Sequence, residues 1–85
     1  MKIVVFDRMF TSTKRLCVLD ENKVVRETVA NPNSFMEVLF QLVDEFNCDS
    51  VDIKGTKMFS KGLQREIQKY ELAKYNENKI TVNII

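Results

Sequence analysis

The stretch Lys2-Ile3-Val4-Val5-Phe6-Asp7 decides the fold, because it sets four consecutive apolar residues between two charged ones. A strand with one wet face alternates apolar and polar residues, whereas an unbroken apolar run is typical of a strand that is covered on both faces. We therefore expect residues 3–6 to form the central strand of a sheet. Asp7 closes that strand and places a carboxylate at its carboxyl end.

The residues that follow predict a β-hairpin. Residues 15–19 and 24–29 are both rich in β-forming residues, and the polar residues 20–23 between them suit a turn. The second of these strands carries charged residues, which discourage pairing with the edge of another sheet. We therefore expect residues 24–29 to lie at one edge of the sheet.

A first helix is predicted after Pro32. Ser34 suits the N-cap position, and Glu37, three residues later, suits the capping-box partner that reaches back to it. Asn47 suits the left-handed conformation in which helices often end. The apolar residues between these positions cover more than one face of the helix. This helix is therefore either packed deeply in the core or offers its second face to a partner.

A strand, a helix and a last strand complete the chain. Residues 50–54 alternate between apolar and polar side chains and predict a strand, which Gly55 ends. A second helix is predicted from about Ser60 to about Tyr75, with its apolar residues along one stripe and a strongly polar outer side. Residues 80–84 alternate again and predict the closing strand.

The predicted order of elements is βββαβαβ, and a length of 85 residues suits a single domain spanning residues 1–85. A strand, a helix and a further strand almost always form a right-handed parallel crossover, so the fourth and fifth strands should be parallel neighbours. The hairpin at the start should be antiparallel. Together these rules predict an α/β fold with one mixed five-stranded sheet, in the order 3-2-1-4-5, and helices packed against it.

This arrangement resembles the ribonuclease H-like fold of nucleases, Holliday-junction resolvases, transposases and actin-like ATPases. The resemblance covers the whole chain in topology, and Asp7 matches the place of a metal-binding aspartate of that family. It implies, as an alternative function, a metal-dependent nuclease or resolvase in which Asp7 and Asp52 bind Mg²⁺ and a dimer or partner supplies further ligands. Such catalysis needs several carboxylates around two Mg²⁺ ions, whereas Lys54 stands at the end of the fourth strand.

The composition narrows the function classes. There is no histidine, so a nucleophilic serine or cysteine would need lysine or carboxylate activation, and Cys17 and Cys48 fit reduced, buried thiols. A formal net charge of +1 argues against a general nucleic-acid binder. The apolar runs are far shorter than the roughly 18 to 20 residues that span a bilayer. We expect a soluble, cytoplasmic protein with no membrane association and no cofactor.

The shortage of carboxylates favours a noncatalytic role. We expect a small interaction protein that binds another protein or, less readily, nucleic acid, and its wealth of Lys, Asn and Ile suits an accessory protein of a phage or mobile element. A homodimer through the first helix or residues 24–29 is a third possibility. The contact region is expected at the carboxyl ends of the parallel strands, where ligands collect in open α/β sheets, with a basic stripe on the second helix beside it. The candidate binding residues are Arg8, Met9, Phe10, Met58, Lys61, Arg65 and Lys69.

Overall fold

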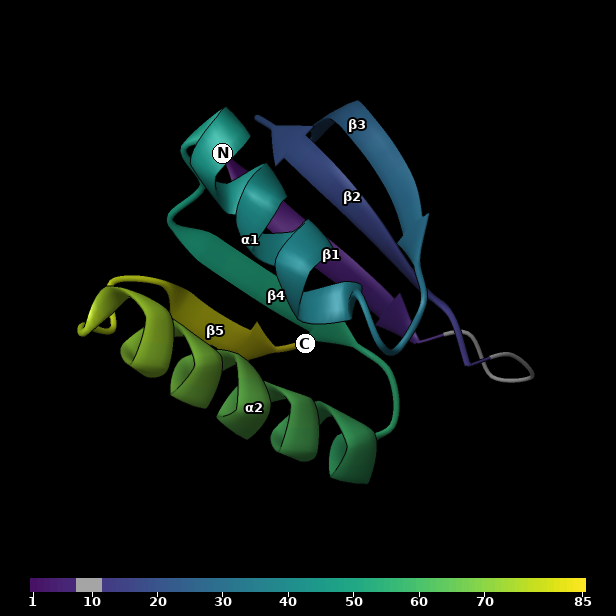
Figure 1. The fold of residues 1–85 in the computed structure, drawn as a ribbon. Helices are drawn as coiled ribbons and strands as arrows, with labels where there is room; N and C mark the ends of the chain where they lie inside the picture. Colours follow the sequence, from purple (N-terminus) through teal and green to yellow (C-terminus); the bar gives the residue numbers. More distant parts are fainter. Residues whose placement is uncertain (8–11) are drawn as a thin grey trace.

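A computed structural model describes residues 1–7 and 12–85 and has the predicted order of elements (Figure 1). The five strands form a single mixed sheet in the order β3-β2-β1-β4-β5, so the predicted class, element order and strand order are confirmed. The bounds of the elements are β1 (Lys2–Asp7), β2 (Lys14–Asp20), β3 (Lys23–Ala30), α1 (Phe35–Phe46), β4 (Ser50–Lys54), α2 (Lys57–Tyr75) and β5 (Thr81–Ile84).

The centre of the sheet is β1, as its apolar run predicts. It pairs antiparallel with β2 and parallel with β4, and β4 pairs parallel with β5. Both helices cover the same face of the sheet (Figure 1), with α1 against β2 and α2 against β4 and β5. Alternate strand residues turn toward these helices and form the core. Its strand residues include Ile3, Val5, Leu16, Val18, Val51, Ile53 and Val82.

The other face of the sheet has no covering element among the described residues, but β1 is buried on both faces as predicted, since Val4 is 7% exposed. A row of paired residues crosses this face, from Cys17 through Val4 and Asp52 to Asn83. The first three of these are nevertheless buried. Long side chains on neighbouring positions explain this burial, because Lys2 reaches across to Asp52 beside Val4.

The helix ends show where local sequence signals succeed and fail. Ser34 is the N-cap of α1, but its side chain makes no capping hydrogen bond and lies 3.5 Å from the carbonyl of Asn31, so the predicted capping box is wrong. Asn47 ends α1 in the left-handed conformation, as predicted. α2 begins at Lys57 rather than near Ser60, because the Thr56 hydroxyl accepts a hydrogen bond from the Phe59 N–H at 3.3 Å.

The predicted edge strand, β3, lies at one edge of the sheet. Its pairing with β2 shifts between Val18 and Leu19, which leaves a bulge at Val25. Val24, Val25 and Val29 are exposed along this edge. Arg26 turns toward α1, where it pairs with Glu45 at 3.2 Å. The edge is therefore tied to α1 by one ion pair and carries exposed apolar side chains elsewhere.

Candidate functional site

A groove of about 370 Å³ opens between the amino-terminal halves of α1 and α2. Both helices begin at the end of the sheet where the carboxyl ends of β1 and β4 lie, because α1 follows β3 and α2 follows β4, and both strands run parallel to β1 (Figure 1). The sequence predicts a contact region at this end of the sheet. We call this hollow the interhelix groove, and its lining residues are Lys14, Pro32, Phe35, Met36, Met58, Phe59, Gly62, Leu63 and Glu66.

The interhelix groove has an apolar floor and an exposed rim. Phe35 and Leu63 belong to the hydrophobic core and are nearly inaccessible, so they close the bottom of the groove. Met58, one of the predicted binding residues, is 87% exposed on the first turn of α2. A thioether side chain adapts its shape to a bound apolar surface more readily than a branched side chain does. The groove therefore offers a flexible apolar contact directly above a rigid apolar floor.

Gly62 stands on the wall of the groove, in the interior of α2. A glycine inside a helix lowers stability by roughly 0.5–1 kcal/mol relative to alanine. Packing against the described residues does not require it, because a Cβ added at this position would have none of their heavy atoms within 4 Å apart from its chain neighbours and its own helix backbone. The missing side chain instead leaves open space at this point of the groove wall.

Lys14 lies at the end of the groove, at the start of β2. Its ammonium group is 5.1 Å from the centre of the Phe59 ring and 5.6 Å from the centre of the Phe35 ring. Such contacts are attractive because the ring face carries negative electrostatic potential. Lys14 thus connects the two helix starts and adds a positive charge to the groove. The sequence gives no sign of this contact, because the three residues come from three separate elements.

A second hollow, of about 340 Å³, continues the groove along α2. It shares Met36 and Glu66 with the interhelix groove and adds Lys69, Tyr70 and Ala73 to the lining. Lys69 is the last member of the predicted basic stripe. The structure therefore brings one end of that stripe to the groove.

The predicted basic stripe of Lys61, Arg65 and Lys69 is exposed along α2. Lys57 extends it by one further turn, since helix residues four apart lie nearly above one another. None of these four cations forms an ion pair with a residue that the structure describes. Their charges are therefore not neutralised by the neighbouring described residues.

The strand register separates the chain positions of the two aspartates of the alternative nuclease function. Asp52 lies opposite Val4, three positions before Asp7 on β1, which corresponds to about 10 Å along a strand. Asp52 is 7% exposed, pairs with Lys2 at 3.1 Å and accepts a hydrogen bond from the Asn83 amide at 3.0 Å. Among the described side chains no group of three carboxylate, thiol or imidazole residues could hold a metal ion.

Burial makes both thiols poor nucleophiles. Cys17 and Cys48 are free and buried, as predicted. Removal from water raises the pKa of each thiol above its usual value, with Glu27 raising that of Cys17 further. Thiolate is the reactive form, so neither cysteine is activated for attack on a substrate.

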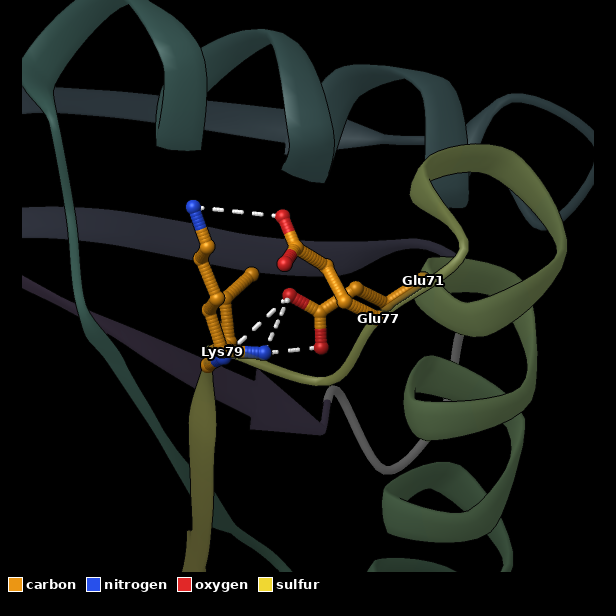
Figure 2. A network of polar contacts seen from close by, with 4 residues as sticks. Glu71, Glu77 and Lys79 are labelled. Carbon is orange, nitrogen blue, oxygen red and sulfur yellow. Dashed lines mark hydrogen bonds and ion pairs between the residues drawn. The ribbon is translucent and has the colours of Figure 1, made fainter.

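The opposite end of the molecule has a different polar arrangement, shown in Figure 2. Glu71 on α2 is 4% exposed, and its carboxylate accepts hydrogen bonds from the backbone N–H groups of Lys79 and Ile80, each at 3.2 Å. The Asn78 amide donates a third, at 3.2 Å. Lys79 pairs with Glu77 at 3.2 Å on the outside. These contacts fix the turn between α2 and β5, so Glu71 has a structural task that the sequence analysis missed.

Comparisons with protein-family models, with curated proteins and with solved structures find no match. The functional assignment therefore depends on the geometry of the chain itself. Three predicted binding residues, Arg8, Met9 and Phe10, lie outside the described residues. In the part of the chain that the structure describes, no helix is long and apolar enough to cross a membrane.

Proposed function

We propose that this chain is a noncatalytic interaction domain that holds an apolar side chain of a partner protein in the interhelix groove. One observation carries the proposal: Gly62 lines the groove at a cost in helix stability, although an added Cβ would meet no described atom outside its chain neighbours and its own helix backbone. Binding of a partner protein would explain why a glycine stands here despite its cost in helix stability.

The size and lining of the groove suit a protein ligand. Small-molecule sites usually enclose about 300–1,000 Å³ and combine apolar walls with several converging polar groups. This groove is at the lower end of that range, and Lys14 and Glu66 are the only charged residues among its described lining residues. Burying one large apolar side chain contributes about 1.5–3 kcal/mol to binding. The geometry thus favours a side-chain anchor from a protein over a cofactor or metabolite.

A relationship to ribonuclease H-like proteins is part of the same proposal. The strand order β3-β2-β1-β4-β5, with Asp7 at the end of the central strand, supports it. The engagement of Asp52 by Lys2 and Asn83 supports the absence of metal chemistry in this member. No observation on the described residues favours the nuclease alternative, and an accessory role in a phage or mobile element stays a prediction from composition.

A second copy of the chain is the simplest partner protein to test. The exposed valines of β3 and the half-buried Met36 and Val38 of α1 are the surfaces that a homodimer would use. Sedimentation over a hundredfold range of concentration measures this directly. A mass that stays at one chain throughout would remove the homodimer and leave a different protein as the partner.

Affinity capture with matched baits tests the proposed function. Gly62→Leu fills the groove from a position where a Cβ meets no other atom, so the fold should be kept. Gln41→Leu adds the same side chain to an exposed position on α1 outside the groove. We expect at least one protein from the native host to be retained by the original chain and Gln41→Leu and lost from Gly62→Leu. Equal recovery by all three baits would contradict a groove-based partner.

A further inference from the structure

We infer that the interhelix groove binds an acidic segment of a protein partner, in which Asp or Glu residues flank the apolar anchor. This inference rests on the proposed function and names the chemistry of its partner. It depends on the charges around the groove rather than on the groove itself.

Unpaired positive charge is concentrated on α2. Lys57, Lys61, Arg65 and Lys69 are exposed and form no ion pair with a described residue. Of the other described cations, Lys23 is also exposed without a described partner, whereas the rest are engaged within the chain. Ion pairs with carboxylates hold Lys2, Arg15, Arg26 and Lys79, while Lys14, Lys54 and Lys74 lie over aromatic rings.

The stripe meets the groove at one end, where Lys69 lines the second hollow. Helix geometry places residues 62, 66, 69 and 73 along a single line, because each step of three or four residues returns close to the same direction. Residues 58 and 65 flank that line on its outer side. Each step of four residues turns about 40° round the helix, so the stripe starts beside this line at Lys69, passes Arg65 and Lys61 and ends at Lys57, about 140° round from Gly62. A segment anchored in the groove would lie beside Lys69 and Arg65, with Lys61 next in line.

The length of the stripe sets the size of the bound segment. From Lys57 to Lys69 there are twelve steps along α2, which correspond to about 18 Å at 1.5 Å per residue. A helical segment of about 12 residues has the same length. Carboxylates spaced one turn apart on such a segment would match the one-turn spacing of the cations.

The lining favours an acidic protein over a nucleic acid. Phosphate chains bind surfaces where cations stand beside exposed rings on which bases stack. Here Phe35 is buried, and the half-buried Phe59 ring is engaged by Lys14. In an acidic segment, the apolar side chain would pack on the floor of the groove and the carboxylates would pair with the cations of the basic stripe.

Selection from a library of random peptides of about 12 residues tests the inference without a known partner. We expect the enriched peptides to combine an apolar residue with several Asp or Glu residues and to lose binding to Gly62→Leu. The double variant Lys61→Glu with Arg65→Glu should bind them about tenfold more weakly, as expected for the loss of two exposed ion pairs. Lys23→Glu makes the same charge change as Lys61→Glu alone, but at the far end of the sheet, and should bind normally.

The other outcomes separate the two proposals. Groove-dependent peptides without acidic residues, insensitive to the double variant, would overturn the inference and leave the proposed function standing. Failure to enrich any peptide that depends on Gly62 would overturn both. Binding of a single-stranded RNA of about 12 nucleotides that is lost in the double variant and kept in Gly62→Leu would assign the stripe to nucleic acid and overturn the inference.

Discussion

The two ends of the sheet differ in whether their polar side chains are hydrogen-bonded and in what surrounds their small residues. Where β5 begins, the carboxylate of Glu71 takes three hydrogen bonds and the Tyr75 hydroxyl donates to Asp44 at 3.1 Å. Where β4 ends, the buried Ser60 hydroxyl has no hydrogen-bond partner among the described residues, and Gly62 faces open space. The first end is arranged for stability. The second retains features that lower stability, as is common where a surface serves binding.

Removing the carboxylate of Glu71 should have the largest effect on the free energy of unfolding. Glu71→Ala leaves the backbone N–H groups of Lys79 and Ile80 without their acceptor, and Ile80 is buried. We expect a loss of about 3 kcal/mol in the free energy of unfolding, measured with urea. Glu77→Ala removes the exposed carboxylate nearby and should change stability by less than about 0.5 kcal/mol. Equal losses in both variants would contradict the structural role of Glu71.

Raising the pH should weaken the fold through its buried thiols. Burial raises the pKa of Cys48 in the folded protein, so the unfolded chain ionises first as the pH rises. Stability from this group is complete below the unfolded pKa of about 8.5 and declines as the pH rises from there through the folded pKa. Urea unfolding between about pH 7 and 10 measures the decline, which should be shallower in Cys48→Ala. An unchanged slope in this variant would mean that the thiol does not contribute.

Filling the wall of the groove should stabilise the chain. Gly62→Ala adds a methyl group in open space and improves helix propensity, so we expect a gain of about 0.5–1 kcal/mol. Lys61→Ala, at the neighbouring exposed position, should leave stability nearly unchanged because Lys and Ala have similar propensities. Thermal melting compares the two variants. A loss of stability in Gly62→Ala would show that the space is needed by the fold itself.

The smallest expected effect concerns the unpaired hydroxyl. Ser60→Ala removes a buried polar group without a described partner and favours the helix, so a gain of about 0.5 kcal/mol is expected. The same melting experiment applies. A loss of 1 kcal/mol or more would show that the Ser60 hydroxyl makes a stabilising hydrogen bond in solution.

The sheet could be predicted from sequence because its signals are local. The apolar run of residues 3–6 identified the central strand, and the crossover rule placed β5 beside β4. The start of α2 was misjudged by three residues because Lys57 and Met58 are exposed and lie outside the apolar stripe that defined the helix. The capping box failed because the Ser34 side chain turns to the Asn31 carbonyl instead.

The groove could be predicted only in part. Met58 was identified from its place after the fourth strand, whereas Lys14, Phe35 and Gly62 meet it only through the tertiary fold. A glycine in a predicted helix indicates a cost, but the open space beside it can be seen only in three dimensions. What covers the second face of β1 could not be predicted for a related reason, because an apolar run does not reveal what lies above it.

The bonds between α2 and β5 have a consequence for local opening. β5 has a single neighbouring strand, but the Gln64 amide donates to the Val82 carbonyl at 2.8 Å and Glu71 holds the turn before it. Peeling β5 from the sheet would break contacts at both the first and the last part of α2. We expect the backbone amide hydrogens of α2 and β5 to exchange with solvent as one cooperative unit, separate from those of the antiparallel strands β1, β2 and β3.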